Sequence, residues 1–169
     1  TTTGYANTDF NVWPMFAPLW MLFLCSFATC SGSTGGGIKM VRAIVLYKQV
    51  FREITHAMHP NAMTFVKLGG SIVPNKIILA VLGFGFLYMA STIFFTLVLA
   101  ASGIDIVSAF SAAVACFNNT GPGLGLVGPD SNYGVLNDFQ VCVCSFAMLL
   151  GRLEIFTLLV VLTPAYWRK

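Results

Sequence analysis

The sequence has little charge: Asp, Glu, Lys and Arg make up 9% of its 169 residues, whereas 57% are apolar and the mean hydropathy is +0.81. A soluble globular domain carries about 25% charged residues, so this chain has too few to cover a folded globule in water. An intrinsically disordered chain would combine low hydrophobicity with high net charge, and the net charge here is +3. The composition excludes a free soluble protein and predicts an integral membrane protein.

Basic residues are missing from two long stretches, 1–38 and 77–151. Six of the nine Lys and Arg residues fall between them, in 39–76, where Glu53 is the one acid. Cytoplasmic loops of membrane proteins are enriched in Lys and Arg, so 39–76 and the C-terminal Arg168-Lys169 are expected on the cytoplasmic side. The four aspartates outside this basic stretch are expected on the opposite side: Asp9, Asp105, Asp130 and Asp138.

The first apolar segment lacks the length to cross a membrane as one helix. Residues 19–30 would form about 18 Å of helix, whereas the hydrocarbon core is about 30 Å thick. The next seven residues, 31–37, contain four glycines, which are poor helix formers. Non-helical backbone is tolerated at membrane depth where it is buried in protein or lines a watery cavity. We therefore expect a broken transmembrane helix whose break, the glycine loop 31–37, lies inside the membrane.

The second half of the sequence has a different organisation. Residues 77–101 form an uncharged stretch long enough to span the membrane as an outer helix. A short helix over 105–117, capped by Asp105, can enter the membrane but not cross it. The loop 118–125, which is rich in glycine, must then return to the same side. An inner helix over 136–166 is expected to cross inward, with Arg152 near its middle.

An internal repeat relates the two halves. Thr3-Gly4 recurs as Thr120-Gly121, 117 residues later, and Cys-Ser-Phe-Ala at 25–28 recurs at 144–147, 119 residues later. At the second offset Gly32 aligns with Gly151, and Ser33 with Arg152. The chain is expected to hold one complete unit preceded by the end of another, with the glycine loop and Arg152 at the same depth.

Two Thr-Gly loops reached by short or broken helices predict an ion filter. A dehydrated K⁺ ion needs a cage of oxygen dipoles, which backbone carbonyls and threonine hydroxyls supply. Glycine permits the backbone angles that turn consecutive carbonyls toward one axis. Each loop taken alone is equally explained as an ordinary turn, and their repetition favours the filter. The candidate K⁺ ligands are Thr2, Thr3, Gly4, Asn119, Thr120 and Gly121.

Arg152 and the glycine loop predict a gate. A charged residue at the centre of a bilayer costs about 2.5 kcal/mol or more and usually faces a cavity or a partner. Glu154 is two residues away and points in a different direction on a helix, so it does not simply neutralise the arginine. An alternative is that Arg152 pairs with a distant carboxylate as a structural counter-charge. The candidate gate residues are Ser31, Gly32, Ser33, Thr34, Gly35, Gly36, Gly37 and Arg152.

The motifs TTTGY, CSGSTGGGIKMVR, NNTGPGLG and GRLEIFTLLVVLTPAYWRK resemble the Trk/Ktr/HKT superfamily of potassium transporters. The closest resemblance, over the whole chain, is to the membrane subunit of bacterial Trk potassium uptake systems. It implies an all-α integral membrane protein built from four helix–pore loop–helix repeats around one pore. Residues 1–58 would then end the third repeat, 59–76 would form a cytoplasmic loop, and 77–169 would be the fourth repeat.

The resemblance also implies the biological setting. K⁺ would be the transported ion, taken up across the bacterial inner membrane, with the glycine loop blocking the pore beneath the filter and beside the arginine. The expected partners are membrane lipid, a second copy of the subunit and a cytoplasmic ring of nucleotide-binding regulatory subunits, and no nucleic acid. The first two repeats are absent, so we expect a C-terminal fragment that cannot complete a filter alone.

Two other function classes remain as alternatives. One is an intramembrane enzyme that uses a serine or cysteine of the glycine loop, and the other is a secondary transporter whose broken helix binds a small solute. An enzyme needs an acid–base partner at membrane depth, and the sequence offers Glu154 alone there. We therefore predict no catalytic residues and no organic cofactor on this chain.

Overall fold

The computed structural model describes residues 2–14, 16–27, 29–30, 32, 35–153, 160 and 163–167. Three candidate gate residues, Ser31, Ser33 and Thr34, lie outside the described residues, as do Glu154, Arg168 and Lys169. The helices and strands, in chain order, are η1 (Phe10–Val12), α1 (Phe16–Cys25), α2 (Met40–Met58), β1 (Lys67–Leu68), β2 (Ser71–Ile72), α3 (Asn75–Ala101), α4 (Ile106–Phe117), η2 (Gly125–Val127), η3 (Tyr133–Val135), α5 (Asp138–Arg152) and α7 (Pro164–Trp167).

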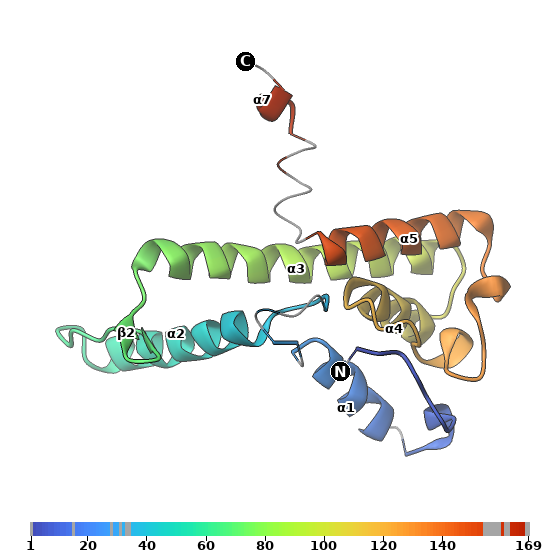
Figure 1. Ribbon diagram of the computed structural model, residues 1–169, viewed down its shortest axis with the longest axis horizontal. Coiled ribbons are helices and arrows are strands. Elements are labelled where there is room, and N and C mark those ends of the chain that lie inside the picture. Colours follow the sequence, from blue (N-terminus) through green and yellow to red (C-terminus); the bar gives the residue numbers. More distant parts are fainter. Residues whose placement is uncertain are drawn as a thin grey trace.

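The longest helix, α3, runs horizontally across the view of Figure 1, from the β-hairpin to the region of α4 and α5. Its 27 residues extend for about 40 Å. Among the described residues it is the one helix that is long and apolar enough to cross a membrane. One stripe of α3 is buried, whereas large apolar residues on its other sides, such as Leu79 and Phe86, are exposed. A helix that is apolar on all sides is typical of a membrane span, because lipid contacts the sides that protein does not cover.

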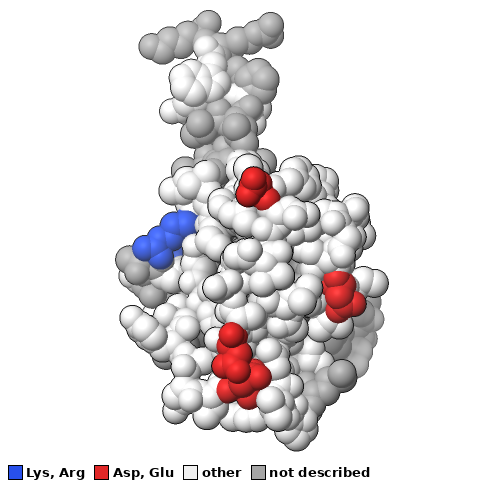
Figure 2. Space-filling view, turned by 90° about the vertical axis from the view of Figure 1, so that its right-hand side faces the viewer, with Lys and Arg blue, Asp and Glu red and all other residues white. Residues whose placement is uncertain are grey.

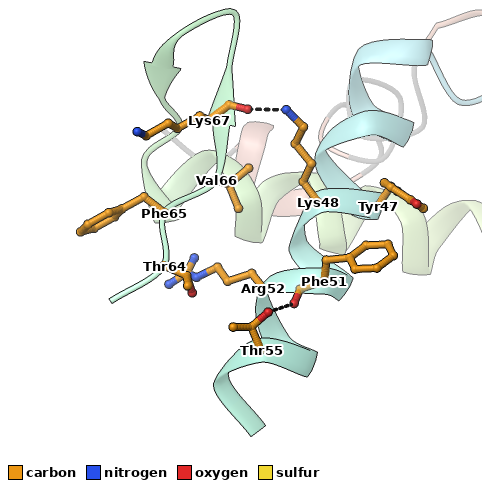
Figure 3. Close-up of a pocket in the computed structure, with 9 residues that line it drawn as sticks. All are labelled: Tyr47, Lys48, Phe51, Arg52, Thr55, Thr64, Phe65, Val66 and Lys67. Carbon is orange, nitrogen blue, oxygen red and sulfur yellow. Dashed lines mark hydrogen bonds between the residues drawn. The ribbon is translucent and has the colours of Figure 1, made fainter. Parts of the chain in front are cut away.

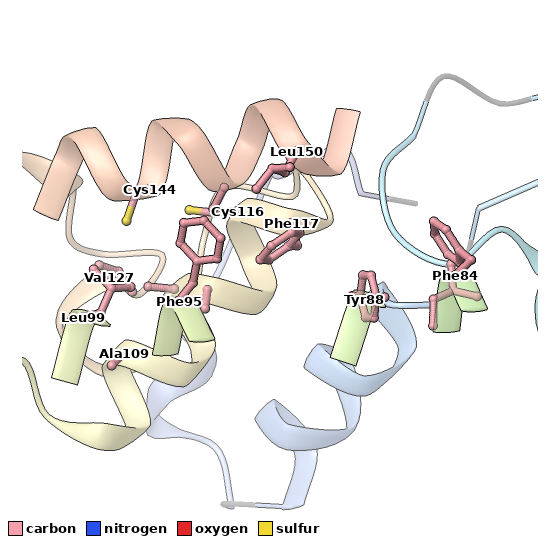
Figure 4. Close-up of a cluster of buried hydrophobic side chains, with 14 residues drawn as sticks. Phe84, Tyr88, Phe95, Leu99, Ala109, Cys116, Phe117, Val127, Cys144 and Leu150 are labelled. Carbon is pink, nitrogen blue, oxygen red and sulfur yellow. The ribbon is translucent and has the colours of Figure 1, made fainter. Parts of the chain in front are cut away.

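The short helix α4 packs between α3 and α5 and contributes more residues to the main buried cluster than any other element (Figures 1 and 4). The Asp105 side chain accepts a hydrogen bond from the Val107 amide at 3.2 Å, so the cap expected from the sequence is present. From Ser108 to the end of α4 nearly every side chain is buried, and many are Ala or Ser. Small side chains let helix backbones approach closely, which is how α4 fits between two larger helices.

The segment between α2 and α3 contains a short two-stranded β-hairpin, whereas the described chain as a whole is mostly helical, in agreement with the expected all-α class. Lys67 pairs with Ile72, and Leu68 pairs with Ser71. Between them Gly69 and Gly70 have φ of +57° and +89°. Two consecutive residues with positive φ make the tight turn that matches the twist of paired strands, and Gly-Gly adopts it without steric cost.

The inner helix expected over 136–166 is described only in part, because residues 154–159 and 161–162 lie outside the described residues. α5 ends at Arg152, with Leu153 as its C-cap, and α7 begins separately at Pro164. Proline lacks the N–H that a continuing helix needs but suits the first helical position, which explains why a new helix begins there. Arg152 therefore lies in the last turn of α5 and not in the middle of a helix.

Basic residues lie near the start of α3, and acidic residues lie near its other end. Lys48 and Arg52 on α2, with Lys67 in the hairpin, lie near the start of α3. Asp105 caps α4 just beyond the other end of α3, and Asp138 begins α5 there. Figure 2 views the molecule from this second end, where separate acidic groups stand on a largely uncharged surface. The separation follows the charge asymmetry expected of a chain that crosses a membrane.

Candidate functional site

The two Thr-Gly loops share an unusual backbone conformation. Thr2 and Asn119 have φ of +54° and +53°, and they are the two non-glycine residues with positive φ in the described part of the chain. Two residues later, Gly4 and Gly121 have φ of +80° and +98°. Positive φ is uncommon outside glycine, so its recurrence at an offset of 117 residues is a specific structural match between the loops.

The two loops also lie against one another. A Cβ atom on Gly4 would collide with the carbonyl oxygen of Thr120 and would lie 3.6 Å from the Cδ atom of Pro122. A cavity of about 180 Å³ is lined by Thr2, Thr3 and Gly4 from one loop and by Thr120 from the other. Segments that are distant in the sequence thus form one site, with no space for a side chain at their contact.

Thr120 carries a polar atom without a partner. Its hydroxyl oxygen is buried and makes no hydrogen bond within the described residues, although its amide donates to the Ala115 carbonyl at 2.9 Å. Buried hydroxyl groups nearly always have a hydrogen-bond partner, so one without a partner requires an explanation. A bound cation would be such a partner, because hydroxyl oxygens can replace part of the hydration shell of an ion.

Asn119 and Gly121, the residues on either side of Thr120, are hydrogen-bonded to neighbouring segments. The side-chain amide of Asn119 donates to the Met148 carbonyl of α5 at 3.3 Å. The Tyr133 hydroxyl, from the loop between α4 and α5, donates to the Gly121 carbonyl at 2.7 Å. Burial raises the pKa of Tyr133, so the phenol stays protonated and remains a donor at physiological pH. These bonds fix the orientation of the loop without using the Thr120 hydroxyl.

The chain entering the glycine loop runs beside the chain leaving it. The Ile38 amide donates to the Ser26 carbonyl at 3.0 Å, and the Met40 amide donates to the Thr29 carbonyl at 2.9 Å. The buried Thr29 hydroxyl donates to the Gly36 carbonyl at 3.2 Å. These bonds satisfy backbone groups that a broken helix would otherwise leave unpaired, which is the condition for non-helical backbone at membrane depth.

Gly35, Gly36 and Gly37 pack against Thr2 of the first Thr-Gly loop and against the end of α4. A Cβ on Gly35 would lie 3.3 Å from the Thr2 hydroxyl oxygen, and a Cβ on Gly36 would lie 2.8 Å from the Phe117 carbonyl oxygen. Gly37 has φ of +80°, and its Cβ would collide with the Asn118 side chain. Gly36 in particular needs to be glycine, because a Cβ there would meet the backbone of Phe117 and Asn118. Gly32 differs, since its Cβ would have open space around it.

Gly151 approaches α4 at the same point. A Cβ on Gly151 would collide with the Phe117 carbonyl, which is also the group that Gly36 approaches. This shared contact brings the glycine loop and the last turn of α5 together at the C-terminal end of α4. Arg152 follows Gly151 directly, and its side chain is exposed. A helix C-terminus carries about half a negative charge, so a cation near this point is favoured.

Asn118 is a residue whose importance the sequence did not reveal. It is fully buried, and its side-chain oxygen accepts a hydrogen bond from the Tyr88 hydroxyl of α3 at 3.1 Å. Its side-chain amide donates to the Ser26 hydroxyl at 3.3 Å. Together with its contact to Gly37, the side chain joins four segments: the end of α4, α3, the end of α1 and the glycine loop. An Asn-Asn pair directly after an apolar helix indicates polar side chains that need hydrogen-bond partners, but the sequence does not identify those partners.

Comparison with known proteins gives consistent matches over the full chain. The sequence profile of the TrkH family, described as cation transport protein, matches residues 1–169. The chain is 45% identical over 169 residues to the Trk system potassium uptake protein TrkH of Vibrio parahaemolyticus and 42% identical to that of Escherichia coli, and it covers 34% and 35% of their lengths.

A solved structure agrees with these relatives. The crystal structure of the potassium transporter TrkH from Vibrio parahaemolyticus matches with a TM-score of 0.90 and 44% sequence identity. The match covers 99% of this chain and 36% of that chain. The chain thus spans about a third of the length of the relatives that it matches.

Proposed function

The chain belongs to the TrkH family of cation transport proteins, and on this basis we propose that it supplies two filter loops and the gate of a pore that takes K⁺ into the cell. One filter loop is Thr2-Thr3-Gly4, and the other is Asn119-Thr120-Gly121. The family is one of transporters, which leaves the intramembrane-enzyme alternative without support.

The observation that carries this proposal is the matched backbone of the two loops. In each loop a residue with positive φ is followed by a threonine with negative φ and then by a glycine with positive φ. This alternation turns successive carbonyl groups toward the same side of the chain, which is the arrangement that coordinates a dehydrated cation. The unpartnered Thr120 hydroxyl adds one more oxygen from the same loop.

The gate is the glycine loop with Arg152. The loop approaches Thr2 and lies against the end of α4. These contacts support a position across the path of an ion that leaves the filter. Arg152 adds a fixed positive charge at this level, which raises the energy of a passing cation. Gly35, Gly36 and Gly37 carry no side chains of their own, so moving this part of the loop aside requires breaking few contacts, among them the bond from Thr29 to Gly36.

We place α3 across the inner membrane of a bacterium, with the basic stretch 39–76 and the C-terminus in the cytoplasm. The charge separation along α3 supports this orientation. A second copy of the complete subunit and a cytoplasmic nucleotide-binding regulatory subunit are the partners that membership of a Trk system suggests.

The direct test is ion flux through the full-length protein in liposomes. Rubidium, a K⁺ substitute, is expected to enter protein-containing vesicles, and external K⁺ should compete with it far more effectively than Na⁺ does. Equal competition by Na⁺ would contradict a K⁺ filter. Uptake of a small organic solute with no rubidium flux would favour the secondary-transporter alternative.

The orientation has its own test in a Lys67→Cys variant of the full-length protein. Lys67 is exposed in the hairpin, so a cysteine there is accessible to reagents from one side of the membrane. A membrane-impermeant maleimide is expected to label it in inside-out vesicles and not in intact spheroplasts. Labelling from outside intact spheroplasts would reverse the proposed orientation.

A further inference from the structure

A second site lies away from the filter, between α2 and the segment that leads into β1. It is an open cavity of about 390 Å³ (Figure 3). Arg52, which lines it, donates to the Asn75 side chain at 3.1 Å, and Asn75 is the first residue of the spanning helix α3. The cavity is therefore at the level where α3 enters the membrane.

The cavity is positively charged. Lys48, Arg52 and Lys67 line it, and no acidic residue of the described chain does. Lys48 donates to the Lys67 carbonyl at 2.7 Å, a neutral acceptor, so its charge is not neutralised by this bond. Glu53, the one acid in 39–76, instead accepts a hydrogen bond from Gln49 at 2.6 Å. The charge of the cavity thus favours an anion.

Thr64 supplies a hydrogen-bonding group without a partner. Its hydroxyl oxygen is buried at the cavity wall and makes no hydrogen bond among the residues that the structure describes. Figure 3 shows the guanidinium group of Arg52 beside it. A hydroxyl and a guanidinium side by side are the donors that a phosphate group accepts, and the planar guanidinium fork matches two phosphate oxygens.

An apolar stripe on α2 is continuous with the cavity. Exposed apolar side chains recur at helical spacing along this helix: Met40, Ile44, Tyr47, Phe51, Ile54 and Met58. Two of them, Tyr47 and Phe51, also line the cavity. A helix with an apolar stripe beside basic residues is typical of a helix that lies in the membrane interface. The stripe and the cavity together match a molecule with an anionic head and apolar chains.

We propose that this cavity binds the phosphate headgroup of an anionic membrane lipid, with its acyl chains along the exposed stripe of α2. Lys48, Arg52 and the Thr64 hydroxyl hold the phosphate, while Tyr47 and Phe51 contact the chains. The proposal rests on the placement of 39–76 at the cytoplasmic membrane face and not on the identity of the transported ion. The Lys67 labelling experiment tests that placement separately.

The test uses the purified full-length protein in detergent, with bound lipids counted by native mass spectrometry. Dioleoyl phosphatidylglycerol is expected to bind more tightly than dioleoyl phosphatidylcholine. Arg52→Gln and Lys48→Gln should each weaken phosphatidylglycerol binding about fivefold, since one cation near an anionic lipid contributes about 1 kcal/mol. Lys76→Gln is the matched control, because Lys76 is exposed at the start of α3 and does not line the cavity.

Two further variants separate the parts of the proposed site. Thr64→Val removes the hydroxyl at nearly constant shape and should weaken phosphatidylglycerol binding without lowering the thermal stability of the lipid-free protein. Phe51→Ser should weaken binding of dioleoyl phosphatidylglycerol but not of its dibutyryl analogue, whose chains are too short to follow the stripe.

Three results would overturn the proposal. Inorganic phosphate that displaces the lipid at equal concentration would indicate a site for free anions. A loss with Lys76→Gln equal to that with Arg52→Gln would indicate diffuse surface attraction. Unchanged lipid binding in Arg52→Gln, together with lost binding of the purified regulatory subunit, would assign the cavity to an acidic protein surface.

Discussion

Gly121→Ser in the full-length protein is expected to lower the preference for K⁺ over Na⁺ about tenfold. Gly121 has φ of +98°, and no atom lies within 4 Å of the place where a Cβ would stand, so the added side chain has space but the backbone is strained. A residue with a side chain pays about 1–2 kcal/mol in such a conformation, and relief of the strain reorients the carbonyls that face the ion. The ratio of rubidium to sodium flux in liposomes measures the change.

Gly103 provides a matched control for this variant. It has φ of +95°, and a Cβ there would also meet open space, but it lies at the end of α3 away from both filter loops. Gly103→Ser therefore introduces the same kind of backbone strain and should leave selectivity unchanged. An equal loss of selectivity in the two variants would mean that general destabilisation, and not the filter, is responsible.

Gly4→Ser is expected to have a larger effect than Gly121→Ser. The backbone at Gly4 has a φ of +80°, which strains any residue with a side chain. An added Cβ would also collide with the Thr120 carbonyl, so both loops must shift. Because the obstructing atom is backbone, it cannot rotate away as a flexible side chain would. Selectivity that survives in both Gly4→Ser and Gly121→Ser would remove these loops from the filter.

The sequence predicted the features that single residues determine locally. Glycine and threonine at fixed spacing identified the two loops, because few residues adopt positive φ without strain. The Asp105 cap was predictable for a similar reason, since a short acidic side chain satisfies the first free amides of a helix. The positions of these elements along the chain therefore follow from the residue types alone.

Other features depend on contacts between distant segments, which the sequence does not display. The hydrogen bonds of Asn118 join residues up to 92 positions apart, and nothing in the order of residues identifies Ser26 as a partner. The end of α5 at Arg152 is not evident from the sequence, because apolar residues continue on both sides of Arg152 and Glu154. The packing of Gly36 on Phe117 likewise depends on how three helices meet.

The buried network around Asn118 bears on which part moves when the gate opens. α4 is held on both sides by α3 and α5, and the Tyr88–Asn118 bond ties its end to α3. A buried hydroxyl that loses its partner costs about 1–3 kcal/mol, so the end of α4 is expected to stay in place. We expect the glycine loop to be displaced instead: the amides of Ile38 and Met40 fasten its base, and the bond from the Thr29 hydroxyl to Gly36 must break when the loop moves.

Gly36→Ala should consequently raise ion flux while leaving selectivity unchanged. The new Cβ would lie 2.8 Å from the Phe117 carbonyl oxygen, and that backbone atom cannot yield, so the loop must move off the end of α4. Overpacking costs about 1–3 kcal/mol, which shifts an equilibrium between closed and open states about 5- to 150-fold. Gly32→Ala is the matched control, because a Cβ there meets no atom within 4 Å and flux should stay at the original level.

Arg152→Ala tests the electrostatic part of the same barrier. Removing the charge should also raise rubidium flux without changing selectivity, whereas Arg152→Lys keeps the charge and should keep flux low. If Arg152 acted instead through the planar fork of its guanidinium, holding loop carbonyls, the lysine variant would conduct like the alanine variant. Loss of flux in both Arg152→Ala and Gly36→Ala, in protein that folds and inserts normally, would contradict the barrier altogether. Arg152 would then be a structural counter-charge, because its removal would damage the pore and not unblock it.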